Sequence, residues 1–258
     1  LAEEFGLSNV RVNRLIKEFD GDIEKIALSR EKSKKADATE KAPKTEKTDE
    51  KTDIAVDEKE INSFRYSKEL DLEDKVSFEG IKIDQIITDL YIRYPLNLTD
   101  ISALASLNNL QKLSLPNCYE LTDISALASL KNLKELHLDD CKKLTDISAL
   151  ASLQNLNELD LSGCHNLTDI SALASLNNLK ELRLGGEKLT DISALASLEN
   201  LNDLNLSSCE KLTDISALAS LNNLKELGLN RCEDLTDISA LASLNNLQKL
   251  SLPHCYEL

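Results

Sequence analysis

A repeating unit of 22 or 23 residues fills the second half of the chain and limits its possible folds more than any other feature. The motif Thr-Asp-Ile-Ser occurs seven times, at intervals of 23, 23, 23, 22, 23 and 23 residues. Its seven copies begin at Thr99, Thr122, Thr145, Thr168, Thr190, Thr213 and Thr236. A fixed period in this range is typical of a solenoid, in which each unit is one coil and only stacking gives the coils a hydrophobic core.

The unit at residues 133–153 has two halves with different periodicities. Leucines alternate with polar residues around Leu136 and Leu138, which predicts a strand with one buried face. From Ile147 to Leu153 apolar residues recur at intervals of three, which predicts a short helix or a 3₁₀ turn with one apolar side.

The two halves together predict an α/β solenoid. A helical turn is wider than a strand, so the stack bends into an arc with a parallel β-sheet on the concave face and helices or 3₁₀ turns on the convex face. Thr145 or Asp146 can cap the turn by accepting hydrogen bonds from its first amide groups.

The strand half follows the pattern Leu-x-x-Leu-x-Leu-x-x-Cys-x-x-Leu, which resembles the leucine-rich-repeat family over roughly residues 80–258. Within that family, the segment LTDISALASLNNLKEL is similar to the bacterial internalin-type repeat. This resemblance implies the fold, whereas an activity has to be argued from individual sites.

Four segments can be distinguished along the chain. Residues 1–30 are predicted to be a small helical module, and residues 31–59 a flexible tether with eight basic and nine acidic groups. Residues 60–86 are the expected N-terminal cap of the solenoid, and residues 87–258 are the repeats, the first degenerate and the last truncated. Since the chain starts without methionine and stops in mid-unit, we expect the natural protein to continue at both ends.

The front module fits three interpretations. The pattern from Phe5 to Ile26, with Gly21 closing the second helix, resembles a ubiquitin-associated (UBA) module, which implies a ubiquitin-like partner for residues 1–30. The same residues fit a DNA-binding helix-turn-helix with Gly6 at its turn, although their net charge of −1 disfavours that interpretation. The third interpretation is a small helical module without a ligand.

Charge and hydropathy restrict the partners. The net charge is −15, and residues 60–258 carry seventeen basic and thirty acidic groups. Such a surface repels phosphate backbones, so we expect no nucleic acid at the repeats but a protein partner, one with a basic surface being favoured. Because no apolar run approaches the ~18 residues of a membrane helix, we expect no membrane insertion.

Six cysteines share one position in their coils: Cys118, Cys141, Cys164, Cys209, Cys232 and Cys255. Neighbours are expected to stack about 4.8 Å apart with parallel side chains, whereas a disulfide needs Cβ atoms nearer ~3.8 Å. We therefore predict free, buried thiols. Free thiols favour a reducing compartment and a cytoplasmic location, with a secreted effector or a cell-surface protein as alternatives.

The sequence offers little catalytic chemistry. Its pair Gly185-Gly186 lies in the 22-residue unit and is expected to let the backbone absorb the missing residue. The histidines occupy unrelated coil positions, and the aspartates of the Thr-Asp-Ile-Ser motif form a row, which suits backbone hydrogen bonding better than calcium. We predict no enzyme, no cofactor and no metal site.

Variable residues mark the candidate site. The segment Thr-Asp-Ile-Ser-Ala-Leu-Ala-Ser-Leu is identical in all seven units, including its exposed serines and alanines, whereas the inner-face positions vary. The predicted protein-binding residues of the concave face are Tyr91, Arg93, Tyr94, His137, Asp139, Asp160, Arg183, Asn205, Asn230, Arg231 and His254. This pattern predicts a non-catalytic protein-binding scaffold. The alternatives are the substrate-targeting region of a larger bacterial effector or regulator, and a secreted adhesin of internalin type.

Overall fold

The computed structural model of the protein describes residues 67–71, 77–78, 83, 85–93 and 95–257. The predictions for the front module and the tether lie outside these residues, as does Tyr94. Within the predicted cap, residues 67–71 form a strand that pairs in parallel with the strand starting at Asp89.

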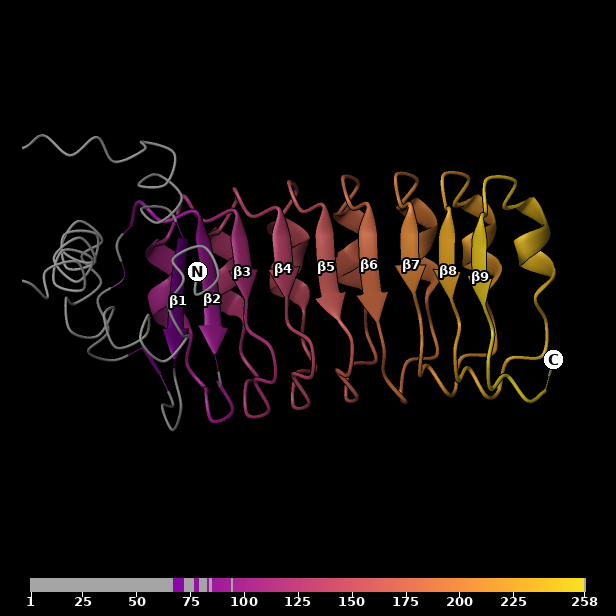
Figure 1. The fold of residues 1–258 in the computed structure, drawn as a ribbon, viewed down its shortest axis with the longest axis horizontal. Helices are drawn as coiled ribbons and strands as arrows, with labels where there is room; N and C mark the ends of the chain where they lie inside the picture. Colours follow the sequence, from indigo (N-terminus) through magenta and orange to yellow (C-terminus); the bar gives the residue numbers. More distant parts are fainter. Residues whose placement is uncertain (1–66, 72–76, 79–82, 84, 94, 258) are drawn as a thin grey trace, which may run out of the picture. The chain divides into compact units, whose positions relative to one another are not determined.

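The described residues form one sheet of nine parallel strands, arranged in the order of the sequence (Figure 1). The strands are β1 (Ser67–Asp71), β2 (Asp89–Arg93), β3 (Lys112–Ser114), β4 (Glu135–His137), β5 (Glu158–Leu161), β6 (Glu181–Leu184), β7 (Asp203–Asn205), β8 (Glu226–Gly228) and β9 (Lys249–Ser251). Each strand pairs in register with the next, so residues at the same coil position form straight columns. The predicted α/β solenoid arc, with the sheet on its concave wall, is confirmed.

The convex wall consists of 3₁₀ turns, one in each regular coil. They are η1 (Ser102–Ser106), η2 (Ser125–Ser129), η3 (Ser148–Ser152), η4 (Ser171–Ser175), η5 (Ser193–Ser197), η6 (Ser216–Ser220) and η7 (Ser239–Ser243). The amide of Ser148 donates to Asp146 Oδ1 at 2.8 Å, and the equivalent aspartate does the same in every regular coil. Of the two predicted capping residues, the aspartate is therefore the one that holds the turn.

Leucine and isoleucine columns fill the space between the two walls. Leu136 and Leu138 from the strand side and Leu150 from the turn side are fully buried. Equivalent residues of the other coils continue the same core along the stack, as the sequence periodicity predicts.

Hydrogen bonds between coils explain why the convex wall does not vary. The hydroxyl of Ser152 donates to the carbonyl oxygen of Ala128 in the preceding coil at 3.0 Å, and to Ala149 in its own coil at 2.9 Å. The amide group of Asn155 donates to the carbonyl oxygen of Lys131 at 2.9 Å, and this invariant asparagine repeats the bond in each coil. The second serine of each turn from η2 to η7 therefore bonds its coil to the preceding one, which limits its variation.

The cysteine column lies inside the coils, as predicted. Its six thiols are free, five are buried and Cys255 is half-buried. Cys164 Sγ donates to the carbonyl oxygen of Leu138 in the preceding coil at 3.3 Å, and Cys232 does the same toward Leu206 at 3.3 Å. Burial raises the pKa of Cys209 to about 11 and that of Cys232 to about 12, so these thiols stay protonated at neutral pH.

The 22-residue unit closes its turn through two buried glycines. A Cβ atom on Gly185 would lie 2.9 Å from the carbonyl oxygen of Ser207, and one on Gly186 would lie 3.0 Å from that of Cys164. The shortened turn brings backbone from both neighbouring coils against these residues. Glycine is therefore needed here for close approach, which refines the prediction that the pair absorbs the missing residue.

Candidate protein-binding surface

Alternation along the strands places two side-chain columns on the concave face of the sheet. The first column consists of the first residue of strands β2 to β9: Asp89, Lys112, Glu135, Glu158, Glu181, Asp203, Glu226 and Lys249. The second column consists of the third residue of the same strands: Tyr91, Ser114, His137, Asp160, Arg183, Asn205, Gly228 and Ser251. All of them are exposed or half-buried, so the face is open along its length.

An aromatic and a basic residue lie at the N-terminal end of this face. Tyr91 is 41% exposed and lies opposite Glu69 of β1. Burial of part of its ring and the nearby carboxylate of Asp89 raise the pKa of Tyr91. Arg93 forms an ion pair with Glu69, so its charge is already partly compensated.

Arg183 lies at the centre of the face, among carboxylates of two coils. Its Nη1 is 3.2 Å from Glu158 Oε1 and 3.9 Å from Asp160 Oδ2, and its Nη2 is 3.7 Å from Glu181 Oε2. His137 Nε2 lies 3.3 Å from the same Glu158 oxygen. The structure thus brings three predicted site residues, His137, Asp160 and Arg183, into one polar cluster.

Two predicted site residues have a local folding role. The amide of Ser162 donates to Asp160 Oδ1 at 2.8 Å, and the amide of Ser207 donates to Asn205 Oδ1 at 2.8 Å. These bonds hold the chain where it turns away from the sheet. In these two coils the side chain therefore also holds the turn, whereas the other coils carry residues of other types at this position.

Asp139 and Asn230 occupy the column that follows the strands. Asp139 is half-buried, and burial together with the nearby carboxylate of Asp160 raises the pKa of Asp139. The Ser251 hydroxyl donates to Asn230 Oδ1 at 2.6 Å, which links it to the last described coil.

Arg231 and His254 lie at a position with a backbone constraint that the sequence analysis missed. Their column has left-handed backbone geometry at Asn117, Asp140, Gly163, Ser208, Arg231 and His254. Glycine, asparagine and aspartate adopt this geometry most easily, which explains part of the variation in the column. Arg231 also pairs with Glu210, at 3.6 Å between Nη2 and Oε1, and His254 Nδ1 lies 2.9 Å from the Tyr256 hydroxyl.

The sequence analysis also missed the first column, formed by the first residue of each strand, as part of the concave face. All eight of its residues from β2 to β9 are charged, and six of them are acidic. The sequence repeats show this recurring negative charge, but the site was predicted from the positions that vary most. This column gives the concave face its acidic character.

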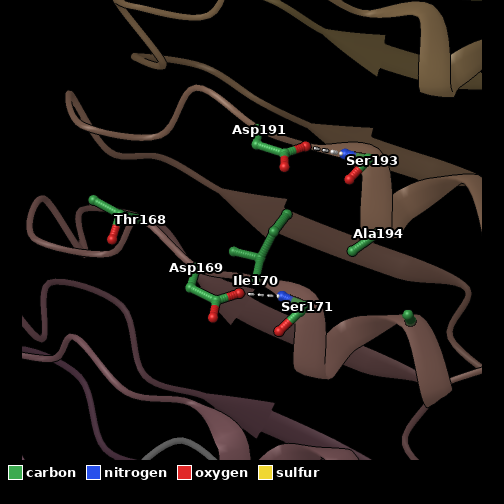
Figure 2. Close-up of a pocket in the computed structure, with 8 residues that line it drawn as sticks. Thr168, Asp169, Ile170, Ser171, Asp191, Ser193 and Ala194 are labelled. Carbon is green, nitrogen blue, oxygen red and sulfur yellow. Dashed lines mark hydrogen bonds between the residues drawn. The ribbon is translucent and has the colours of Figure 1, made fainter.

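A pocket on the convex side lies where η4 and η5 begin (Figure 2). Asp169 accepts a hydrogen bond from the Ser171 amide and Asp191 accepts one from the Ser193 amide, both at 2.8 Å. One oxygen of each carboxylate is thus used by the turn that it caps. The same pattern recurs in the other coils, so these residues are explained by the fold.

Within the described part of the chain, no three histidine, cysteine, aspartate or glutamate side chains are grouped as metal ligands. None of the helices described there is both long and apolar enough to cross a membrane.

Comparisons with known proteins agree with this architecture. A model of leucine-rich repeats in two copies matches residues 108–152, 131–175, 154–197 and 177–220. A comparison with curated protein sequences finds no match.

Solved structures include similar solenoids. Internalin C2 from Listeria monocytogenes is 34% identical, and the match covers 69% of this chain and 76% of that one, with a TM-score of 0.55. An internalin (inlF) from the same organism is 27% identical over 70% of this chain and 65% of its own, less than two thirds, with a TM-score of 0.52. The leucine-rich-repeat domain of the type III effector XopL shares the fold at 24% identity, over 75% of this chain and 70% of its own, with a TM-score of 0.60. The chain belongs to the leucine-rich-repeat family, and its repeats are internalin-like.

Proposed function

We propose that the protein is a non-catalytic scaffold that binds a protein partner along the concave face of its sheet. Leucine-rich-repeat proteins typically mediate protein–protein interaction, and their repeats are generally not catalytic. The observation that carries the proposal is the open face of nine strands, on which exposed and half-buried side chains differ from coil to coil.

Several side chains of this face take no part in the described hydrogen bonds that build the turns. Tyr91, Ser114, His137, Arg183 and Gly228 differ in size and charge although their coil position is the same. Tyrosine and arginine are the residue types that most often dominate interface energies. A partner that contacts this face would use Tyr91 at one end and the cluster around Arg183 at the centre.

Photo-crosslinking from matched positions tests the proposal. A photoreactive amino acid is placed at Ser114 on the sheet face or at Ala196 on the convex turn η5, in the full chain. We expect the same partner adduct from Ser114 and from a second sheet position, Ser251, and none from Ala196. Adducts from Ala196 without adducts from the two serines would show that the partner binds the other wall.

A reducing compartment remains part of the proposal. It is supported by six free thiols that are wholly or mostly buried. Thiol titration of the native protein is expected to be slow at the five buried cysteines and complete only after unfolding. Intact disulfides between neighbouring coils in protein from its natural source would contradict this placement.

A further inference from the structure

We infer that the partner also carries an extended acidic segment, which binds a row of lysines beside the concave face, where the chain enters the strands. This strand-entry edge consists of the residues between each 3₁₀ turn and the following strand, such as Lys131, Asn132 and Lys134 before β4. The inference rests on the proposed function, because it specifies a second contact of the same partner.

The strand-entry edge differs in charge from the rest of the protein. From the coil of β3 to that of β9, its side chains outside the core are asparagine, glutamine and lysine, with Glu199 as the one acidic residue. Its lysines are Lys131, Lys134, Lys180 and Lys225, and all four are exposed. The chain as a whole carries thirty basic and forty-five acidic groups, so this edge is a positively charged strip on an acidic protein.

Within the described part of the chain, no carboxylate forms an ion pair with any of these four lysines. A lysine of the first column behaves differently, since Lys112 Nζ lies 2.8 Å from Glu135 Oε1. Lys134 Nζ instead donates to a neutral group, Gln111 Oε1, at 2.8 Å. The positive charge of the strand-entry edge is therefore not neutralised by the coils that carry it.

Three of the lysines form a straight row at a regular spacing. The Lys180 amide donates to the Asn157 carbonyl oxygen at 2.8 Å, and the Asn157 amide donates to that of Lys134 at 2.7 Å. The same bonds continue through Asn202 to Lys225, both at 2.8 Å. Lysines thus occupy every second coil, two strand spacings or about 9.6 Å apart, with an asparagine between them. We call these three residues the lysine row.

The spacing of the lysine row fits an extended peptide. A polyproline-II segment has about three residues per turn and rises about 3.1 Å per residue, so every third side chain returns to the same side after about 9.3 Å. A segment with a carboxylate at every third residue would therefore meet successive lysines of the row.

The neighbouring first column favours a protein segment over a nucleic acid. Each lysine of the row is followed directly by a glutamate of the first column. A continuous phosphate backbone along the row would be repelled by these glutamates. A protein can instead place an acidic segment on the row and a basic surface over the first column, so that the two contacts together fix its orientation.

The test measures binding of a labelled peptide of five Glu-Pro-Pro units to the full chain, by fluorescence anisotropy in about 0.1 M salt, where charges beyond ~10 Å are screened. Two triple variants remove equal charge from exposed lysines. The first changes the lysine row, by Lys134→Gln, Lys180→Gln and Lys225→Gln. The control changes lysines that follow the strands, by Lys142→Gln, Lys188→Gln and Lys211→Gln. We expect the first to weaken binding about tenfold and the control to change it less than about twofold.

A second measurement identifies the lysines that contact the peptide. A carbodiimide joins a carboxylate to a lysine amine in direct contact, and mass spectrometry then locates the link. We expect links at Lys134, Lys180 and Lys225. A peptide of the same composition with its glutamates in one block tests the spacing, and we expect it to bind more weakly.

Equal losses in the two triple variants would overturn the inference, because the peptide would then respond to total charge. Absence of binding to the wild type, or equal binding of the block peptide, would overturn it as well. So would single-stranded DNA that binds the lysine row more tightly than the peptide does. The contrast between crosslinks from Ser114 and from Ala196 does not depend on these lysines, so the proposed function and this inference can fail separately.

Discussion

Single aspartates in this protein experience opposite environments according to their place in the coil. Asp146 lies at the start of a turn, where the Ser148 amide donates to it and lowers the pKa of its carboxyl. Asp139 lies half-buried beside Asp160, where burial raises the pKa of its carboxyl. The ionised carboxylate of Asp146 therefore stabilises the fold, whereas the ionised carboxylate of Asp139 destabilises it.

Asp146 gives a prediction for acid stability. A lowered pKa in the folded state means that the ionised carboxylate contributes stability above the unfolded pKa of ~3.9, and that this contribution is lost as pH falls through the folded pKa. Asp146→Ala should lower the melting temperature at pH 7 and change it less at pH 2. Asp146→Asn keeps the acceptor oxygen and should fall between wild type and alanine at pH 7. Thermal unfolding followed by circular dichroism at both pH values checks this.

The opposite sign holds for Asp139. A raised pKa in the folded state means that its favourable contribution is present below the unfolded pKa and is lost as pH rises through the folded pKa. Asp139→Asn should therefore raise the free energy of unfolding at pH 7, by less than about 1 kcal/mol because solvent screens a half-exposed carboxylate, and the gain should vanish near pH 3. Urea unfolding at the two pH values measures it, with exposed Asp234→Asn as the control. A gain that is larger at pH 3 than at pH 7 would refute the assignment.

At the scale of the elements, the coil could be predicted from the sequence because its period and its two apolar patterns leave few alternatives. The strand around Leu136, the turn after Ile147 and the buried cysteines all follow from spacing. Bonds between coils could not be predicted, since the link from Asn155 to the Lys131 carbonyl depends on how the coils stack. The left-handed position was missed although its column holds Asn117, Asp140 and Gly163, which favour this geometry, because the other coils carry serine, arginine or histidine there.

The short coil provides a prediction at this scale. Gly185→Ala places a Cβ atom 2.9 Å from the Ser207 carbonyl oxygen, so backbone has to move, and we expect a loss of about 1–3 kcal/mol in the free energy of unfolding. Gly228→Ala meets the Asn205 side chain at 3.1 Å, which can yield, so its cost should be clearly smaller. Urea unfolding of both variants measures the two losses. Equal losses would mean that glycine matters at these positions only for flexibility.

At the scale of the whole solenoid, the convex and concave walls have different roles. The convex turns hold neighbouring coils together through serine, asparagine and aspartate, whereas the sheet face presents charged and aromatic side chains outward. The sequence predicts a binding site on the sheet face, and this stays a prediction. Two of the predicted residues, Asp160 and Asn205, also hold turns, which the repeat pattern did not indicate. The acidic first column was missed because it is nearly uniform.

The central claim, that a partner binds the sheet face, is tested most directly by the affinity of the crosslinked partner for two variants. Tyr91→Ala removes an exposed aromatic side chain, and Ala196→Arg adds a bulky one to the convex wall. We predict that Tyr91→Ala weakens binding by about 2 kcal/mol, roughly thirtyfold, at an unchanged melting temperature, and that Ala196→Arg leaves the affinity unchanged. Full affinity in Tyr91→Ala together with lost binding in Ala196→Arg would contradict the account.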